Sequence, residues 1–233
     1  PTDGEVYIWR DGEAEPRYLF GEGKYTFAVR FSPDGSKLLT VEFRSNTDIS
    51  IWVADVASGA AIEATPHEGD AKFLPGPWKA DGSGFYLLTD EGREFSGLAF
   101  HTLATNTRAW IESPEHDIDE VAGSANGRVL AWMENVDGWG KLHLRDLERG
   151  VDLPEPKLPP GAASMLGSGL SLSRDGSRLA LVWDQPTRPA EVLVVDTATG
   201  DALPVTEMRA AGLSALELRE PELIRFESFD GRQ

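Results

Sequence analysis

The sequence contains no cysteine. This absence excludes disulfide bonds, thiolate metal sites and a cysteine nucleophile, and it fits the cytoplasmic location that we expect. Long apolar runs are lacking too, since they stop at about five residues, as at Val129–Met133. No such run is long enough to span a bilayer or to form the core of a signal peptide.

Positive charge is scarce. The 233 residues include 22 Lys and Arg against 39 Asp and Glu, so the formal net charge is -17 at pH 7. Such a surface repels phosphate backbones and anionic lipids. We therefore expect neither a nucleic-acid partner nor a membrane partner. Acidity that serves solubility explains this balance more simply than attraction of a cationic substrate, but both interpretations stay open.

The sequence also lacks the residue patterns of common catalytic and metal sites. A nucleophile elbow needs Gly-x-Ser-x-Gly, and the nearest approach, Gly212-Leu213-Ser214, has Leu216 where the second glycine belongs. The four histidines are dispersed, with no His-x-x-x-His pattern. The acidic stretch Glu115–Glu120 lacks the glycine and the ligand spacing of a calcium loop, so we interpret it as a solvated turn. We predict no catalytic residue, no bound metal and no cofactor.

What the chain does contain is an internal repeat. Four turns end in Asp-Gly or Asn-Gly, with their glycines at Gly35, Gly82, Gly127 and Gly176, which gives steps of 47, 45 and 49 residues. A second turn follows 23 or 24 residues after each of these, at Gly59, Asn106, Gly150 and Gly200. Two independent markers that keep register over four copies indicate a repeat architecture.

Short apolar runs lie on both sides of these turns. Asp-Gly or Asn-Gly between two such runs is a strong hairpin signal, because these residues tolerate positive φ. The runs that we expect to form strands include 37–43, 85–89, 128–133 and 178–183 after the first turns, and 49–53, 98–102, 141–144 and 192–195 before the second turns. Each repeat then holds about four strands and no helix.

Four-stranded units of this length are typical of propeller blades. We therefore predict an all-β fold, a β-propeller of four-stranded antiparallel blades, with four complete repeats plus a partial or split blade. The propeller is expected at 1–220, with blades at about 25–66, 71–112, 117–155 and 165–206 and a partial blade at 1–20. Six tryptophans, Trp9, Trp52, Trp78, Trp110, Trp132 and Trp183, are predicted to pack in the blade core.

The two ends of the chain leave alternatives open. Glu5–Phe20 is predicted to form two strands around the Asp11-Gly12 turn, and Leu213–Phe229 has a weaker strand signal. The ends could pair into a split blade that closes a ring, with Ile224–Phe229 beside Val6–Trp9. The last segment could instead pair with a neighbouring molecule or lack order, or blades could be missing upstream.

Several segments carry a family resemblance. Phe31–Gly35 alone is not specific, because TolB-like and tricorn-like propellers have similar repeats. Thr89–Phe95, Asn135–Trp139 and Gln185–Val192 occur in consecutive order, and Glu220–Gln233 follows them. Together these segments resemble the propeller of the prolyl oligopeptidase (S9) family of serine peptidases, near its dipeptidyl-aminopeptidase and acylaminoacyl-peptidase branches.

This resemblance implies a role. Residues 221–233 resemble the crossing into an α/β-hydrolase domain, which in the family carries the Ser, Asp and His of the triad. The propeller would then gate and orient peptide substrates for that domain of the same polypeptide, and the chain would be an excised piece that is inactive alone.

Four charged residues are candidates for contact with substrate. Arg44, Arg93, Glu94 and Arg188 lie in or beside loops between paired strands, and loops carry function more often than strands do. A surface ion pair is the simpler explanation for any one of them.

Two other functions remain in competition with the gating role. A free-standing TolB-like propeller would use its mouth or a face for protein interaction, but it has no need of the segment Glu220–Gln233. An enzyme built on the propeller itself would need carboxylates or metal ligands that converge on the axis, and no such set is evident in the sequence.

Overall fold

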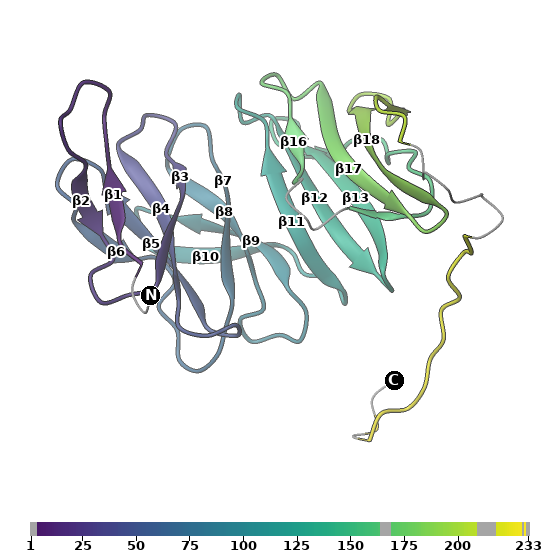
Figure 1. Ribbon diagram of the computed structural model, residues 1–233, viewed down its shortest axis with the longest axis horizontal. Coiled ribbons are helices and arrows are strands. Elements are labelled where there is room, and N and C mark those ends of the chain that lie inside the picture. Colours follow the sequence, from purple (N-terminus) through teal and green to yellow (C-terminus); the bar gives the residue numbers. More distant parts are fainter. Residues whose placement is uncertain (1–3, 164–168, 209–217, 230, 232–233) are drawn as a thin grey trace.

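The computed structural model describes residues 4–163, 169–208, 218–229 and 231, and within these ranges it contains nineteen strands and no helix. The strands form one two-stranded sheet followed by four larger antiparallel sheets. These sheets stand side by side in the order of the chain (Figure 1). The predicted fold class, a β-propeller of four-stranded antiparallel units, is confirmed.

The first half of the chain holds three sheets. A hairpin of β1 (Val6–Ile8) and β2 (Arg17–Phe20) comes first, around the expected Asp11-Gly12 turn. The next two sheets consist of β3 (Thr26–Phe31), β4 (Lys37–Phe43), β5 (Ile49–Asp55) and β6 (Ala61–Glu63), and of β7 (Phe73–Trp78), β8 (Gly84–Thr89), β9 (Gly97–Thr102) and β10 (Thr107–Glu112).

The second half holds two sheets. The third four-stranded unit consists of β11 (Asp117–Gly123), β12 (Val129–Val136), β13 (Trp139–Asp146) and β14 (Val151–Asp152). The fourth consists of β15 (Ala162–Ala163), β16 (Ser171–Leu172), β17 (Arg178–Gln185), β18 (Arg188–Asp196) and β19 (Ala202–Pro204), with β15 and β16 both paired to β17. This sheet starts at Ala162, before the expected boundary at 165, because Ala162 and Ala163 pair with Asp184 and Trp183.

The repeated turns have a common local cause. In the first, Asp34 Oδ1 accepts hydrogen bonds from Ser32 Oγ (2.7 Å) and from the Ser36 backbone N–H (3.0 Å). These donors hold the pKa of Asp34 at about 2, because they favour the carboxylate. The same contacts recur around Asp175, and Asn126 replaces the aspartate in the third turn. The glycine that follows adopts a φ of 70° at Gly35 and 75° at Gly176, which side chains with a Cβ rarely tolerate.

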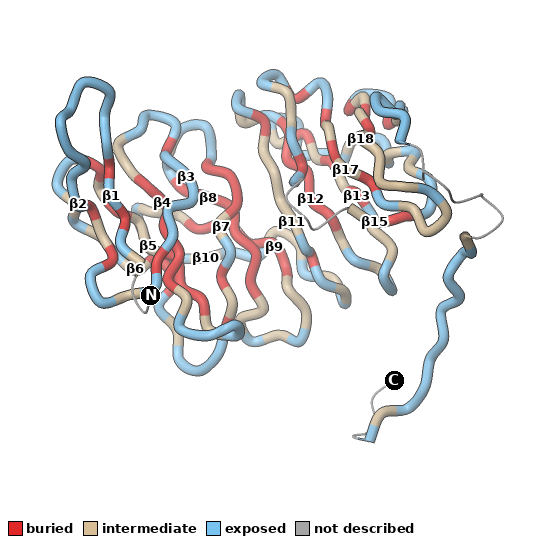
Figure 2. The backbone as a smooth tube through the Cα atoms, viewed as in Figure 1, coloured by how far each residue is buried: buried red, intermediate tan, exposed pale blue. Residues whose placement is uncertain are grey.

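The core lies in layers between successive sheets, not within one central cluster (Figure 2). Strand β12 shows how this arises: Leu130 and Trp132 pack against the second four-stranded sheet, while Ala131 and Met133 pack against the fourth. Alternate residues of a strand point to opposite faces, so a strand between two sheets must be apolar throughout. Each fully buried Leu or Met contributes about 1.5–3 kcal/mol.

Two of the predicted core tryptophans are exceptions. Trp78, Trp132 and Trp183 are buried as expected, but Trp9 is 62% exposed and Trp110 is 44% exposed. Trp9 follows β1 in a two-stranded hairpin that no other sheet of the described residues covers on its outer side, and Trp110 lies on the outer strand β10. A tryptophan in or next to a strand therefore belongs to the core only where a second sheet packs over it.

Within the described residues, the two ends of the chain do not pair to close a ring. Residues 218–229 contain no strand, and they lie on the side of the third and fourth units, far from β1 and β2 (Figure 1). Of the alternatives for the chain ends, the structure does not show the pairing of Ile224–Phe229 with Val6–Trp9, and Phe226 and Phe229 are 75% and 103% exposed. The part of the weaker strand signal at 213–217 lies outside the described residues.

Candidate functional site

The loops between the second and third strand of every unit share one edge of the molecule. In an antiparallel unit of four strands this loop lies at the same end as the connection to the next unit. Hydrogen bonds tie these loops to the next connection, from Thr47 Oγ1 to Asp70 (2.9 Å) and from Ser96 N to Asp117 (2.8 Å). We call this edge the loop face, and it is defined by residues 44–48, 90–96, 137–138 and 186–187.

All four sequence-predicted candidates lie on or beside the loop face, but they differ in their contacts. Arg44 is held by three carboxylates: its guanidinium lies 2.8 Å from Glu63, 3.3 Å from Asp48 and 3.5 Å from Glu42. Arg93 stacks over the Trp110 ring at 5.2 Å and donates to the carbonyl of Pro114. These interactions fix loop conformation, so neither guanidinium is presented freely to a ligand.

The other two candidates are exposed. Glu94 lies in the β8–β9 loop, and Arg188 is the first residue of β18, opposite Gln185 in the hairpin. Within the described residues, Arg188 makes no ion pair, which leaves its guanidinium available. The structure does not bring the four residues into one cluster, because they lie in three different units: Arg44 in the β4–β5 loop, Arg93 and Glu94 in the β8–β9 loop, and Arg188 at the start of β18.

The sequence predicts a solvated turn at the acidic stretch Glu115–Glu120, and this prediction is wrong. From Asp117 onward the stretch forms the start of the inner strand β11. Glu120 Oε1 accepts a hydrogen bond from the Leu170 backbone N–H (2.6 Å), which ties the third unit to the fourth. Burial raises the pKa of Glu120. Among the described residues, no group of three or more His, Asp and Glu side chains is placed to hold a metal ion.

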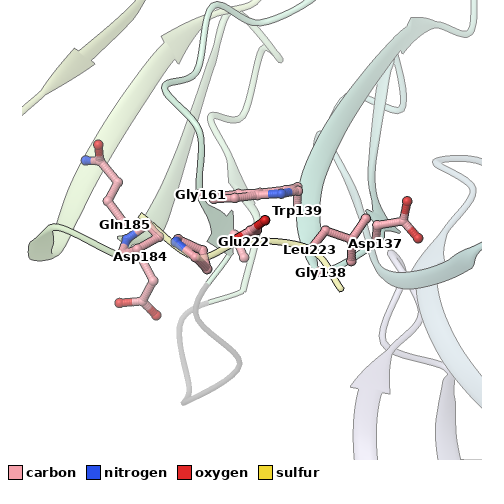
Figure 3. Close-up of a pocket in the computed structure, with 11 residues that line it drawn as sticks. Asp137, Gly138, Trp139, Gly161, Asp184, Gln185, Glu222 and Leu223 are labelled. Atoms are coloured by element: carbon pink, nitrogen blue, oxygen red, sulfur yellow. The ribbon is translucent and has the colours of Figure 1, made fainter. Parts of the chain in front are cut away.

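A hollow of about 420 Å³ lies on the loop face between the third and fourth units. The β12–β13 hairpin contributes Asp137 and Trp139, the β17–β18 hairpin contributes Asp184 and Pro186, and the C-terminal segment 221–223 forms one wall. Figure 3 shows the Trp139 ring across the hollow, with the Glu222 side chain beside it. Asp137 and Asp184 lie on opposite flanks, with their carboxylates turned outward (Figure 3).

Backbone packing shapes this hollow. A Cβ on Gly161 would overlap the Asp184 carbonyl and the Trp183 indole, so only glycine fits at this position in the lining of the hollow. Gly140 N donates to Gly161 O (2.8 Å), which joins the two units at the floor. Outside the hollow, Arg225 forms an ion pair with Asp137 (2.7 Å), which holds the C-terminal segment against the rim.

Sequence reasoning did not select Trp139 as a site residue. The signal was present, because a tryptophan directly after the Asp137-Gly138 hairpin turn is placed at a loop tip where no neighbouring sheet covers it. The Glu222 contribution had no sequence signal, since it depends on where the C-terminal segment lies.

No helix suited to crossing a membrane is found in the described ranges.

Comparisons with known proteins show the fold. The sequence matches no known protein family and no curated protein, but solved structures match it closely in shape. A puromycin-hydrolyzing peptidase from Mycobacterium tuberculosis superposes with a TM-score of 0.76 and 22% identity, over 93% of this chain and 34% of that one. Prolyl oligopeptidase B from Galerina marginata gives 0.79 and 15%, over 99% and 34%.

TolB proteins match as well. The putative TolB from Agrobacterium tumefaciens superposes with a TM-score of 0.64 and 14% identity, over 87% of this chain and 74% of that one. The chain spans about a third of the length of the peptidases that it matches. At the level of fold the resemblance is confirmed: this chain has the β-propeller fold shared by the propeller parts of prolyl oligopeptidase-type peptidases and by TolB.

Proposed function

We propose that this chain is the non-catalytic propeller part of a prolyl oligopeptidase-type serine peptidase, which gates and orients peptide substrates for an α/β-hydrolase domain of the same polypeptide. The observation that carries the proposal is the extent of the match: 93–99% of the chain superposes on about a third of each of two such enzymes. The sequence has no nucleophile elbow of its own, so the chemistry must lie elsewhere.

The arrangement of the loop face supports this role. The C-terminal segment lies at this face, where residues 221–223 form one wall of the hollow beside Trp139. A domain that followed the segment would sit over the loops that carry Arg44, Arg93, Glu94 and Arg188. In that arrangement Arg188, exposed and unpaired among the described residues, is the best placed for contact with a peptide. Arg44 and Arg93 would shape the loops instead.

Peptides are the expected substrates. The Galerina marginata enzyme was solved bound to a 35mer hydrolysis and macrocyclization substrate, and a propeller beside a hydrolase site can restrict entry by size. An enzyme that excludes bulky substrates needs a rigid frame around the entry, and the layered cores between the sheets supply one.

The test is to express the chain alone and joined to the coding region that follows it in its gene. We expect the joined protein to hydrolyse a five-residue peptide much faster than the same peptide sequence embedded in a folded 100-residue protein. The chain alone should hydrolyse neither substrate. Hydrolysis of both substrates at equal rates would contradict gating, and a following region without Gly-x-Ser-x-Gly would contradict the whole proposal.

A free-standing interaction propeller of the TolB kind is the alternative. The match to 74% of the Agrobacterium tumefaciens chain favours it, because there the propeller makes up most of the protein. Capture of a stable protein partner by the chain alone, together with a following region that encodes no hydrolase, would support this alternative over the first.

A further inference from the structure

The tryptophans of this chain show a recurring arrangement. Lys24 Nζ lies 4.6 Å from the centroid of the Trp52 ring and 2.9 Å from the Glu42 carboxylate. Arg145 lies 5.1 Å from the Trp132 ring and 2.7 Å from Glu112. In both cases a cation is held between an indole face and a carboxylate, where the ring quadrupole and the negative charge both attract it.

Trp139 has the ring and the carboxylates of this arrangement without the cation. It is half-buried at the hairpin tip, with Glu222 beside it and Asp184 at the flank of the hollow. Neither Asp184 nor Glu222 forms an ion pair within the described part of the chain. Among the described residues, no Lys or Arg lines this hollow, and a second hollow of about 580 Å³ that Trp139 also lines has Glu155 and Glu220 against a single described basic residue, Lys141.

We infer that the hollow beside Trp139 binds an arginine side chain of a peptide. A guanidinium is planar, so it stacks on an indole while its N–H groups remain free for carboxylates at its edge. Glu222 supplies such a carboxylate beside the ring, Asp184 adds a negative charge at the outer flank (Figure 3), and Arg225 already shows the pairing of a guanidinium with Asp137 at the same rim (2.7 Å). The net charge of -17 adds a long-range attraction for cationic peptides.

This inference rests on the proposed function for its choice of a peptide, and it adds a preference that the fold alone does not give. A substrate that reaches the loop face with an arginine would be anchored between the third and fourth units. The preference would be for arginine over its neutral isostere citrulline, and it would weaken with salt because the carboxylates are exposed.

The probe is the peptide Ac-Gly-Arg-Gly-NH2, titrated into the ¹⁵N-labelled 233-residue chain, with Ac-Gly-citrulline-Gly-NH2 as its neutral match. Each tryptophan gives one indole N–H signal, and the Trp139 signal is identified as the one lost in Trp139→Leu. We expect the arginine peptide to shift this signal in a saturable way, and the citrulline peptide to bind at least about fivefold more weakly.

Two variants measure the contributions. Trp139→Leu should weaken binding about two- to fivefold, and the pair Asp184→Asn with Glu222→Gln about two- to tenfold, with a smaller dependence on salt. The second variant changes only exposed side chains, so it tests the inference even where Trp139→Leu disturbs the hairpin. The matched controls are Trp9→Leu and Glu22→Gln, both exposed and remote from the hollow, and they should bind as the parent chain does.

Equal shifts with the citrulline peptide, no shift with either peptide, or equal losses in the control variants would each overturn the inference. The outcome is separable from the proposed function, since no hydrolase domain takes part in the titration. A chain that ignores arginine but still gates peptide entry in the joined protein would reject this inference alone.

Discussion

Replacing His101 should remove part of the acid sensitivity of the fold. His101 lies on β9 with no exposed surface, its ring 4.9 Å from that of Phe85, and both ring nitrogens are buried without a hydrogen-bond partner. Burial, with a smaller effect from the charge of Arg108, lowers the pKa of His101 to about 4. The folded chain therefore keeps this imidazole neutral at a pH where the unfolded chain protonates it.

The sign and size follow from linkage. The unfolded pKa of histidine is about 6.5, so the stabilisation is fully present above pH 6.5 and is lost as the pH falls from there to 4. With a folded pKa of about 4, the free energy of unfolding should drop by about 2 kcal/mol between pH 7 and pH 5 and about 3 kcal/mol by pH 4 from this group alone.

His101→Leu should abolish that part of the pH dependence. It also removes two unsatisfied polar atoms from the core, so the variant should be at least as stable as the parent at pH 7. Urea unfolding at pH 7, 6, 5 and 4 gives the free energies, and the difference between variant and parent should grow by about 2 kcal/mol from pH 7 to pH 5.

The control is Phe100→Leu, which removes the neighbouring ring on β9 without a titrating group. It should lower stability by a similar amount at every pH. A His101→Leu variant whose stability runs parallel to that of the parent from pH 7 to pH 4 would refute the reasoning, because the imidazole would then be solvated or bonded in the folded chain.

Two further predictions concern the fourth unit and the C-terminal segment. Gly161→Ala should lower the free energy of unfolding, measured in urea, by about 1–3 kcal/mol. The new methyl group overlaps the Asp184 carbonyl and the Trp183 indole and disturbs the hydrogen bond from Trp183 to the Pro159 carbonyl. Unchanged stability would show that the floor of the hollow can relax. Amides at Ile224–Phe226 should exchange in seconds to minutes while Val192–Val195, bonded on both sides in β18, exchange far more slowly. Equal protection of the two segments from exchange would mean that Ile224–Phe226 forms backbone hydrogen bonds with another strand.

Much of the fold could be read from local chemistry. The first turn glycines, Gly35 and Gly176 among them, have the positive φ expected of hairpin turns, and strand β4 has the predicted bounds Lys37–Phe43. This succeeded because each of these turns is held by its own Asp or Asn side chain and each strand after it is a short, mostly apolar run. Neither depends on distant parts of the chain.

The predictions from sequence that were wrong concern features set by long-range packing. The exposure of Trp9 and Trp110, the strand at Asp117–Gly123 and the lack of strand pairing at Ile224–Phe229 follow from which sheets stand beside them. The site was missed for the same reason. Trp139 and Glu222 are 83 residues apart in the sequence, and only the meeting of a hairpin tip with the C-terminal segment brings them together.

Labelling with a fluorophosphonate probe tests the central claim most directly. Such a probe reacts with a serine activated by a histidine and an oxyanion hole. Intact-protein mass spectrometry of the 233-residue chain should show no adduct, while the chain joined to its following coding region should gain one probe per molecule, on the serine of a Gly-x-Ser-x-Gly sequence. Stoichiometric labelling of any serine in the chain alone, or none in the joined protein, would contradict the account of this propeller as the non-catalytic partner of a hydrolase domain.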